Sequence, residues 1–461
     1  MTSTAQRLTT LLTEFLGAPP PLRLRTWDGS ESGPADAPVL VVHSRRALRR
    51  LLWQPGELGL AEAYISGEID VEGDLADGLR ALREAPLSLP RPGPGRLARA
   101  ALSAARLGAL GPRPPAPAGR ARLRGTRHTT ARDAAAISHH YDLSNDFYAL
   151  LLDESMAYSC AYWACGDPQY GLAEAQRDKL ELICRKLALR PGARLLDIGC
   201  GWGALTLYAA AKHTVRVTAV TLARRQYDHV RAAVRERGLE SLVDVRLAHY
   251  REAPQGPYDA VSCIEMGEHV GDAEYASFAG LLHRVLRPGG RLLLQQMSRG
   301  AHAPGGGAFI ETYIAPDMHM RPLGQTVGLL EDAGLEVRAT ESLREHYART
   351  VAAWRDTLEE RWDAFVALVG EPTARVWRLY LVGGGQAFEA RRMGVDQILA
   401  VRPGPDGTSG MPPSLATWYD GMPTSTADSY DGLPPWPSDA HAGTHAAVPP
   451  SSIDRRARKG D

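Results

Sequence analysis

The fold of this chain is decided by the stretch Leu195-Leu196-Asp197-Ile198-Gly199-Cys200-Gly201-Trp202-Gly203. An apolar run that ends in an acid predicts a buried parallel strand, and the glycines after it predict a tight turn into a helix from about Ala204. Glycine allows positive φ and lets the backbone approach a ligand closely. The first amides of a helix are available to bind that ligand. The stretch therefore predicts a strand that opens onto a nucleotide-like ligand.

Two other interpretations of this stretch are weaker. A dinucleotide site would show Gly-x-Gly-x-x-Gly with an acid ~20 residues later, but the next predicted strand, from Val215 to Val220, is followed by Thr221. A plain strand-turn-helix corner would need no glycine at every second position. A ligand-binding turn accounts best for the pattern.

Composition indicates a globular protein of two or three domains. The chain has 461 residues, 44% of them hydrophobic, and a net charge of +0. No apolar run approaches the ~18 residues of a membrane span, and the first 17 residues lack the apolar length of a secretory signal, so a cytoplasmic protein is expected. The five cysteines show no Cys-x-x-Cys spacing. Neither a zinc site nor a disulfide framework is expected, and no metal.

Four segments are expected along the chain. They are a small α/β domain over 1–88, a basic Pro/Gly/Arg linker over 89–132, a domain of alternating strands and helices over 133–402, and a disordered tail over 403–461. The small domain is expected to contain a strand over 39–42, a helix over 45–52, and a helix and a hairpin over 56–74. Strands of the large domain are expected over 194–198, 216–220, 243–247, 258–264 and 290–296, with helix-rich structure over 329–368. This order predicts a doubly wound, mostly parallel sheet.

The linker carries most of the local positive charge. Eight arginines without an intervening acid lie between 91 and 132: Arg96, Arg99, Arg106, Arg113, Arg120, Arg122, Arg124 and Arg127. One interpretation is a solvated connection between domains. The other is a segment that rests on anionic lipid head groups, with an amphipathic helix over 97–110.

Motifs on both sides of the glycine turn point to one family. They are Ile137-Ser138-His139-His140-Tyr141-Asp142-Leu143-Ser144-Asn145-Asp146-Phe147-Tyr148, Met156-Ala157-Tyr158-Ser159-Cys160-Ala161-Tyr162-Trp163 and Glu265-Met266-Gly267-Glu268-His269-Val270-Gly271. Over roughly residues 55–400 the chain resembles the cyclopropane-fatty-acyl-phospholipid synthases, a family that includes the mycolic acid cyclopropane synthases. The stretch from Phe309 to Met320 resembles a narrower branch that methylates oleoyl phospholipid at C10. The implied fold is that of a class I, Rossmann-like methyltransferase with helical insertions covering the site.

The resemblance implies S-adenosylmethionine as cosubstrate and a set of residues around it. Tyr158 and Ser159 match the lid over the methionine part. Gly199, Gly201 and Gly203 match the loop beneath it, with Asp197 a further contact. Thr221 and Gln226 match the ribose-side pair, and Tyr250 and Arg251 the adenine-side pair, although core packing would also account for Tyr250. The acid usual before that pair is replaced by His249.

The resemblance also implies the reaction. A cis alkene attacks the sulfonium methyl, a carbocation forms in the acyl chain, and a weak base removes one proton. Bound bicarbonate is the family's base, and the matching shell here is Cys160, Glu268 and Tyr347 with the backbone near Met297. Gln295 stands where the family has histidine, which leaves bicarbonate binding open. Other interpretations also stay open, namely a helix-start acid for Glu268 and a small buried hydrophobe for Cys160.

The expected partners are unsaturated phospholipid acyl chains and an anionic membrane surface, with the enzyme bound peripherally to the inner face of the membrane. Nucleic acid is not expected, because no Asn/Asp-Pro-Pro-Tyr/Phe element follows the fourth strand. A small-molecule or carrier-bound substrate is the alternative. The sequence leaves open whether the product is a cyclopropane or a 10-methylene chain, and whether the protein is a homodimer.

Overall fold

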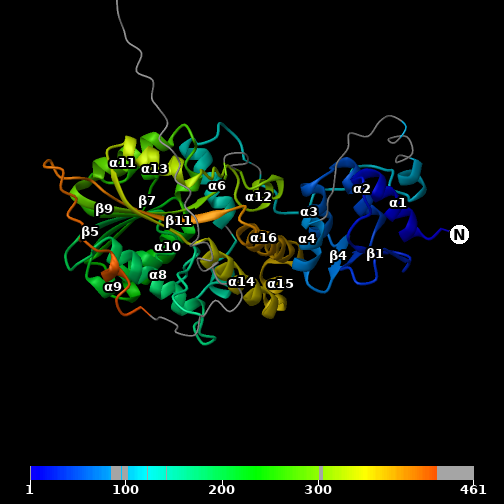
Figure 1. The fold of residues 1–461 in the computed structure, drawn as a ribbon, viewed down its shortest axis with the longest axis horizontal. Coiled ribbons are helices and arrows are strands. Elements are labelled where there is room, and N and C mark those ends of the chain that lie inside the picture. Colours follow the sequence, from blue (N-terminus) through cyan, green and yellow to red (C-terminus); the bar gives the residue numbers. More distant parts are fainter. Residues whose placement is uncertain are drawn as a thin grey trace, which may run out of the picture.

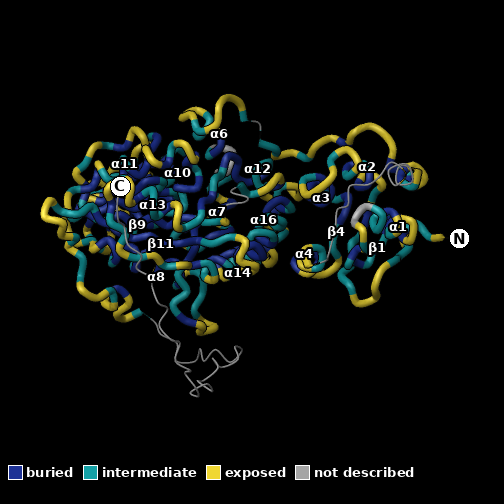
Figure 2. The backbone as a smooth tube through the Cα atoms, turned by 45° about the horizontal axis from the view of Figure 1, so that its top comes forward, coloured by how far each residue is buried: buried dark blue, intermediate teal, exposed yellow. Residues whose placement is uncertain are grey.

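The computed structural model describes residues 2–84, 95, 102–121, 123–141, 143–300 and 305–422, arranged around two sheets (Figure 1). An N-terminal lobe holds a four-stranded sheet, and a larger lobe holds a seven-stranded one. The central strands of the larger sheet are buried (Figure 2), whereas its two edge strands are only partly buried.

The large sheet has the order β10-β11-β9-β8-β5-β6-β7. Its strands are β5 (Arg194–Ile198), β6 (Arg216–Thr221), β7 (Val243–Leu247), β8 (Tyr258–Ile264), β9 (Leu286–Ser298), β10 (Glu336–Ser342) and β11 (Gly394–Val401). The first five of these run parallel, whereas β11 is antiparallel to both β9 and β10. The chain order reverses between β5 and β8, and ligands bind at the carboxyl ends of strands at such a point. The predicted doubly wound, mostly parallel α/β fold is confirmed.

Helices cover both faces of this sheet (Figure 1). One face carries α8 (Leu172–Lys186), α9 (Ala204–His213) and α10 (Arg224–Glu236), and the other carries α11 (Tyr275–Val285) and α13 (Leu323–Asp332). Because both faces are covered, strands such as β5 are buried along their length, with only Arg194 exposed.

A third layer of helices packs around an aromatic-rich core beside the sheet. It comprises α7 (Asn145–Leu151), α12 (Ala308–Tyr313), α14 (Arg344–Glu360), α15 (Trp362–Val369) and α16 (Glu371–Glu389), and α6 (Thr130–Tyr141) precedes it in the chain. Phe147, Tyr148, Trp354 and Trp377 are buried in this core. Short 3-10 helices lie at η1 (Tyr250–Glu252), η2 (Gly267–His269) and η3 (Ala416–Trp418).

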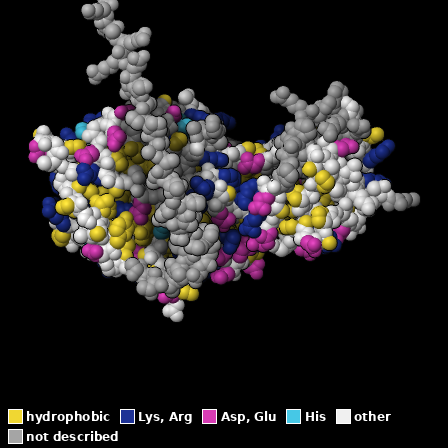
Figure 3. Space-filling model, viewed as in Figure 1, with side chains coloured by type: hydrophobic (Ala, Val, Ile, Leu, Met, Phe, Trp, Pro, Cys, Tyr) yellow, Lys and Arg dark blue, Asp and Glu magenta, His cyan; other side chains and the backbone are white. Residues whose placement is uncertain are grey.

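The N-terminal lobe has the strand order β2-β1-β3-β4. Its elements are α1 (Thr4–Leu16), β1 (Arg23–Thr26), β2 (Glu31–Ser32), β3 (Val39–Val42), α2 (Arg45–Trp53), α3 (Glu57–Ile65), β4 (Ile69–Glu72) and α4 (Leu75–Glu84). Acidic and basic side chains gather where the lobes meet (Figure 3), and Arg375 of α16 pairs with Asp70 of β4 at 2.8 Å. The helix and strand expected over 39–52 are present, but β4 pairs with β3, so residues 56–74 form no hairpin of their own.

The sequence interpretation of the large lobe missed two strands and was wrong about part of the tail. The segment 329–368 is helix-rich as expected, but it also contains β10, and β11 was not anticipated, because neither strand follows the parallel strand-helix alternation. The tail expected to be disordered from 403 is packed as far as residue 422. Trp418 is buried, and Arg185 donates to the carbonyl oxygens of Trp418 and Asp420 at 3.2 and 2.6 Å. Residues 423–461 lie outside the described part.

The linker arginines also differ from expectation. Arg120 forms an ion pair with Glu62, and Arg127 pairs with Asp317 at 3.1 Å. The side chain of Glu62 is 2% exposed, and a buried carboxylate needs a counter-charge. The Arg120 side chain is therefore paired with a buried carboxylate. Arg124 is exposed, and Arg122 lies outside the described residues. Within the described ranges, no helix is both long and apolar enough to cross a membrane.

Candidate active site

A pocket lies at the carboxyl ends of β5, β6 and β8, where the chain order of the sheet reverses. Its volume is about 1090 Å³ when the open mouth is included. The predicted site residues that line it are Tyr158, Ser159, Asp197, Gly199, Gly201, Thr221, Gln226 and Tyr250. Their convergence from four separate segments makes this the candidate active site.

The floor of the pocket is the glycine turn after β5. Gly199, Gly201 and Gly203 all have positive φ, at +76°, +55° and +86°. A Cβ on Gly199 would lie 2.8 Å from Met266, whereas a Cβ on Gly201 would meet nothing within 4 Å. Glycine is required at position 199 because a side chain there would collide with Met266. At position 201 the left-handed backbone favours glycine, and the absence of a side chain keeps the space above it open. Gly203 caps the start of α9.

Asp197 supports this turn from below. Its two carboxylate oxygens accept hydrogen bonds from Thr206 at 2.7 Å and Ser262 at 2.8 Å. Burial raises the pKa of Asp197, while these hydroxyls and Lys179 lower it. Asp197 lines the pocket, but its bonds tie the turn to α9 and β8.

The second strand of the pocket brings Thr221 and Gln226 together, as predicted. The Thr221 hydroxyl donates to Oε1 of Gln226 at 2.8 Å, and the amide of Ala223 donates to the same hydroxyl at 3.2 Å. Gln226 uses its side-chain oxygen in this hydrogen bond, so its NH2 group can donate to a hydroxyl of the ligand.

The adenine side contains an acid that the sequence motif did not reveal. Asp133 of α6 lines the pocket and lies 3.2 Å from Nε2 of His249, which is 1% exposed. Tyr250 lines the same wall. Arg251 does not line the pocket; its guanidinium lies over the Tyr250 ring at 5.2 Å. An acid thus lies beside His249 and Tyr250 after all, but it comes from α6, over 100 residues earlier in the chain.

A lid segment with Tyr158 and Ser159 crosses the other side of the pocket, and α8 fixes it from beneath. Gln176 donates to the carbonyl oxygens of Ala157 and Ser159 at 3.2 and 2.9 Å, and Lys179 donates to the Ser159 hydroxyl at 2.7 Å. Burial lowers the pKa of Lys179, while the nearby Glu265 opposes that shift.

Three of the four predicted catalytic residues, Cys160, Gln295 and Tyr347, meet at one carboxylate, that of Glu265. The backbone amide of Cys160 and the side-chain amide of Gln295 each donate to Oε1 at 2.8 Å, and the Tyr347 hydroxyl donates to Oε2 at 2.6 Å. Burial raises the pKa of Glu265, and the three donors and Lys179 lower it. Cys160 takes part through its backbone, because burial and Glu265 raise the pKa of its thiol well above the usual value.

A row of polar side chains orients Gln295. Gln397 donates to Oε1 of Gln295 at 2.9 Å, Lys186 donates to Oε1 of Gln397 at 2.7 Å, and Lys186 also pairs with Glu341. Gln295, Gln397 and Glu341 are direct cross-strand neighbours on β9, β11 and β10. The sheet register thus places the whole row.

Glu268 lies apart from these bonds. It is fully buried in η2, and among the described residues no side chain donates to its oxygens; the backbone amides of Glu268 and Met297 lie close enough to lower its pKa. Burial and the neighbouring charge of Glu265 raise its pKa well above the usual carboxyl value. Of the two buried carboxyls, Glu268 therefore has the surroundings that disfavour the charged form more strongly.

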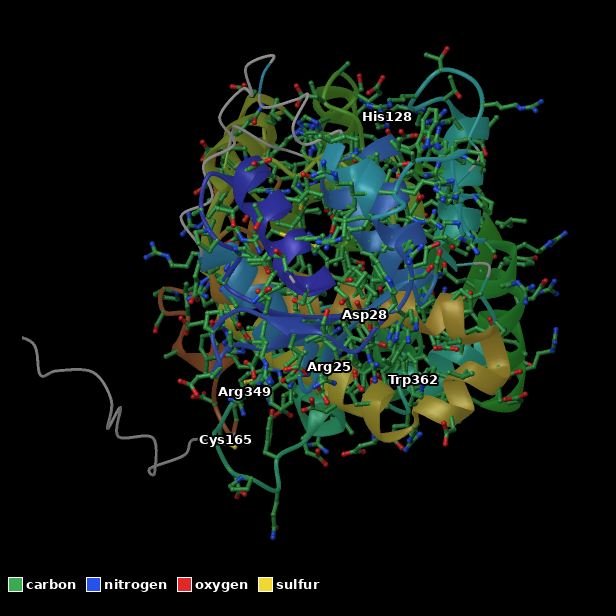
Figure 4. The ribbon with its side chains drawn as sticks, turned by 90° about the vertical axis from the view of Figure 1, so that its right-hand side faces the viewer. Arg25, Asp28, His128, Cys165, Arg349 and Trp362 are labelled. Atoms are coloured by element: carbon green, nitrogen blue, oxygen red, sulfur yellow. The ribbon has the colours of Figure 1, made fainter. Side chains whose placement is uncertain are left out.

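Metal ligands are not assembled here. The described residues contain no group of three or more His, Cys, Asp or Glu able to hold an ion. Burial lowers the pKa of His269 to about 4, and the side chains of His139 and His140 lie outside the description. All five cysteines are buried and unpaired; Cys165 lies beside Arg349, which donates to its carbonyl, far from His128 (Figure 4).

The family model for mycolic acid cyclopropane synthetase matches residues 128–398. The chain belongs to this family. A probable fatty acid methyltransferase of Mycobacterium tuberculosis is 38% identical over 410 residues, covering 87% of this chain and 95% of the relative. The tuberculostearic acid methyltransferase of the same organism is 32% identical, covering 84% of this chain and 88% of the relative.

Solved structures of the family agree with the fold. A mycolic acid cyclopropane synthase in complex with SAH and CTAB is 32% identical with a TM-score of 0.55, covering 58% of this chain and 97% of that one. The protein is thus an S-adenosylmethionine-dependent methyltransferase of the cyclopropane synthase family. Its pocket fits that cosubstrate, because the three left-handed glycines form a cradle and the space above Gly201 is open.

Bicarbonate does not fit in the same way. Three of the groups expected to hold it, the Cys160 amide, Gln295 and Tyr347, already donate to Glu265. The sequence interpretation overlooked Glu265, although it lies in the quoted Glu265–Gly271 motif. Only the cross-strand register shows which glutamate of that motif faces these donors.

Proposed function

We propose that this enzyme transfers a one-carbon unit from S-adenosylmethionine to the cis double bond of an unsaturated fatty acyl chain in membrane phospholipid. The observation that carries the proposal is the aromatic wall shared by the cofactor pocket and the buried core. Tyr158 lines the pocket, its ring lies 5.1 Å from Trp354 and 5.5 Å from Tyr148, and its hydroxyl meets Tyr380 at 3.2 Å.

Such a wall suits a carbocation in an apolar chain. Aromatic faces attract positive charge, and a dry apolar surface accepts hydrocarbon while keeping water from the cation. S-adenosylmethionine would supply the methyl group as an electrophile. The chain's own residues would orient the alkene, exclude water and remove the proton. The naming of two relatives as fatty acid methyltransferases supports the substrate class.

Access to membrane lipid is supported by one patch on the N-terminal lobe. Its exposed apolar members are Leu52, Trp53, Leu102 and Leu110, with exposed fractions of 42%, 56%, 53% and 59%. The ring nitrogen of Trp53 donates to the carbonyl of Gly111 at 2.9 Å, so α2 and the segment 102–113 lie together. The same two segments carry basic residues: Arg46 and the half-buried Arg49 on α2, and the exposed Arg106 and Arg113 on the segment 102–113.

A bilayer with anionic head groups is the occupant that matches this patch. Tryptophan and leucine enter the interface, and each nearby arginine adds about 1 kcal/mol on an anionic surface. The membrane-facing segment proposed here includes Arg106 and Arg113 of the predicted linker. It excludes Arg120, which is paired internally.

The proposed product is an exocyclic methylene at C10 of an oleoyl chain. The Phe309–Met320 stretch and Gln295 in place of histidine favour it over a ring. A change in the proton acceptor alters which collapse of the cation is fastest, and ~1.4 kcal/mol already gives tenfold selectivity.

The test is expression in a host that makes unsaturated phospholipid, followed by mass spectrometry and proton NMR of the extracted lipid. A mass gain with a vinylidene signal is expected. Upfield ring protons would assign a cyclopropane instead. Purified enzyme that modifies free or carrier-bound acyl chains but leaves phospholipid vesicles untouched would overturn the phospholipid substrate.

A further inference from the structure

The anion position of the active site is filled by the protein itself. Glu265 receives three hydrogen bonds, from the Cys160 amide at 2.8 Å, Gln295 at 2.8 Å and the Tyr347 hydroxyl at 2.6 Å. A carboxylate and bicarbonate present the same charge and the same pair of acceptor oxygens on a planar carbon. A side chain that satisfies these donors leaves no role for a second anion there.

The direction of each hydrogen bond can be deduced from Lys186, which has donors only. The Oε1 atom of Gln397 must accept from Lys186, so its nitrogen donates to Oε1 of Gln295. The nitrogen of Gln295 must then face Glu265. Every group on Glu265 is therefore a donor, which is the surrounding of an ionised carboxylate.

Glu268 supplies the contrast. Only backbone amides, those of Glu268 and Met297, lie near its buried carboxyl among the described residues, and neither meets ordinary hydrogen-bond geometry, whereas Glu265 receives three well-formed bonds. Two carboxyls in contrasting surroundings adopt different protonation states. The negative charge of the pair belongs to Glu265.

The backbone gives an independent indication. Glu265 has φ of +51°, in the left-handed region that disfavours side chains. Strain retained at a pocket is grounds for a functional hypothesis. The same backbone turn directs Glu265 into the lining of the cofactor pocket, directly after β8.

We propose that Glu265 is the proton acceptor of this enzyme and that turnover needs no bicarbonate. This rests on the proposed function. The alkene pair forms a C–C bond to the donated methyl carbon while the C–S pair returns to sulfur, which leaves the chain with a carbocation. If the Glu265 carboxylate takes a proton from the added carbon at this stage, the released C–H pair closes a cyclopropane ring. For the 10-methylene chain, a hydride first shifts with its electron pair from C10 to C9, which moves the cation to C10. Glu265 then takes a proton from the added carbon, and the released C–H pair forms the exocyclic double bond. The neutral carboxyl later loses that proton to water.

The test compares the full-length enzyme with Glu265→Gln and Glu265→Gly in buffer purged of carbon dioxide, with and without added bicarbonate or formate. Glycine accepts the left-handed backbone and opens the anion position, whereas glutamine fills it without a base. Glu240→Gln is the matched control, because Glu240 is exposed in a loop away from the pocket. Methyl transfer to lipid, S-adenosylmethionine affinity by calorimetry, and ¹³C-bicarbonate binding by NMR are measured.

Wild type is expected to be indifferent to bicarbonate and to show no bound bicarbonate signal. Both variants should keep their S-adenosylmethionine affinity and lose 10²–10⁴-fold in rate. Bicarbonate or formate should restore part of the rate to Glu265→Gly and none to Glu265→Gln. The glycine variant alone should bind ¹³C-bicarbonate.

The proposal is overturned if wild type binds bicarbonate or needs it, or if Glu265→Gln keeps its rate with unchanged cosubstrate affinity. Failure of the proposed function is a different result. It would appear as no lipid methylation by wild type, and the NMR comparison would still decide whether Glu265 occupies the anion position.

Discussion

The side-chain amide of Gln397 donates to Oε1 of Gln295 over 2.9 Å and so turns the nitrogen of Gln295 towards Glu265. The two glutamines are register partners on antiparallel strands. Gln397 touches no pocket atom, so it is a positioning residue.

Gln397→Leu should release that orientation. The Gln295 amide can then present its oxygen to the carboxylate, which weakens one charged hydrogen bond worth ~1.5–3 kcal/mol. A fall in kcat of about tenfold is expected, with an unchanged KM for S-adenosylmethionine. Gln169→Leu, at an exposed position, is the control. A raised KM with unchanged kcat would contradict the positioning role.

Tyr347→Phe should move the acidic limb of the rate–pH profile to higher pH. The Tyr347 hydroxyl lowers the pKa of Glu265, against the larger raising effect of burial. Its removal raises that pKa further. A base works only when deprotonated, so activity is lost as pH falls through this raised value. The pH dependence of kcat/KM measures the shift, and a limb displaced to lower pH would exclude Glu265 as the base.

Gly201→Val should abolish cosubstrate binding with little loss of fold. The left-handed backbone at +55° costs about 1–2 kcal/mol with a side chain, and the added atoms would enter the open space of the pocket. Calorimetry should show at least a tenfold weaker affinity, about 1.4 kcal/mol. Gly324→Ala, in helix α13 with no atom near its Cβ, is the control. Unchanged affinity in a folded Gly201 variant would remove the turn from the binding site.

Asp133→Asn should weaken S-adenosylmethionine binding through its adenine end. An amide in place of the carboxylate loses the charge-assisted bond to an exocyclic amine, about a tenfold effect on KM. The rate at saturation should be preserved. A cosubstrate analogue that lacks this amine should bind wild type and variant equally, and an equal loss for both ligands would point to a change in fold instead.

The double change Trp53→Ala and Leu110→Ser should weaken binding to anionic vesicles about tenfold, because burying one large apolar side chain is worth ~1.5–3 kcal/mol. Wild-type binding should also fall with salt, since exposed charges are screened over ~8 Å at physiological ionic strength. Leu247→Ser changes a leucine of similar exposure on β7 and is the control. Binding that ignores salt and both substitutions would remove the patch as the membrane contact.

The sequence predicted those features whose residues lie close together along the chain. The run from Leu195 to Gly203 sets a strand, a turn and a helix in one stretch, and the Thr221–Gln226 pair lies within a single turn of chain. The antiparallel pair β10 and β11 escaped prediction because β10 is charged and only partly buried, so it has no buried-strand pattern.

For a related reason, the sequence did not show which carboxylate lies at the centre of the site. Glu265 and Glu268 lie three residues apart in one motif, and nothing local distinguishes an anchored anion from a neutral acid. The distinction comes from the donors, and Cys160 lies 105 residues away from Glu265 along the chain. The hydrogen bond between Asp133 and His249 joins residues 116 positions apart, so the sequence did not reveal it either.

The cross-strand row also bears on how the molecule matures. Gln295 and Gln397 are 102 residues apart and Lys186 and Gln397 are 211 apart, and contacts this distant in sequence form slowly because loop closure precedes them. The floor of the pocket needs only residues up to Met266, which emerge earlier during synthesis. The hydrogen bond that turns Gln295 towards Glu265 can therefore form only after β11 has paired with β9, so the last of the described strands completes the surroundings of Glu265.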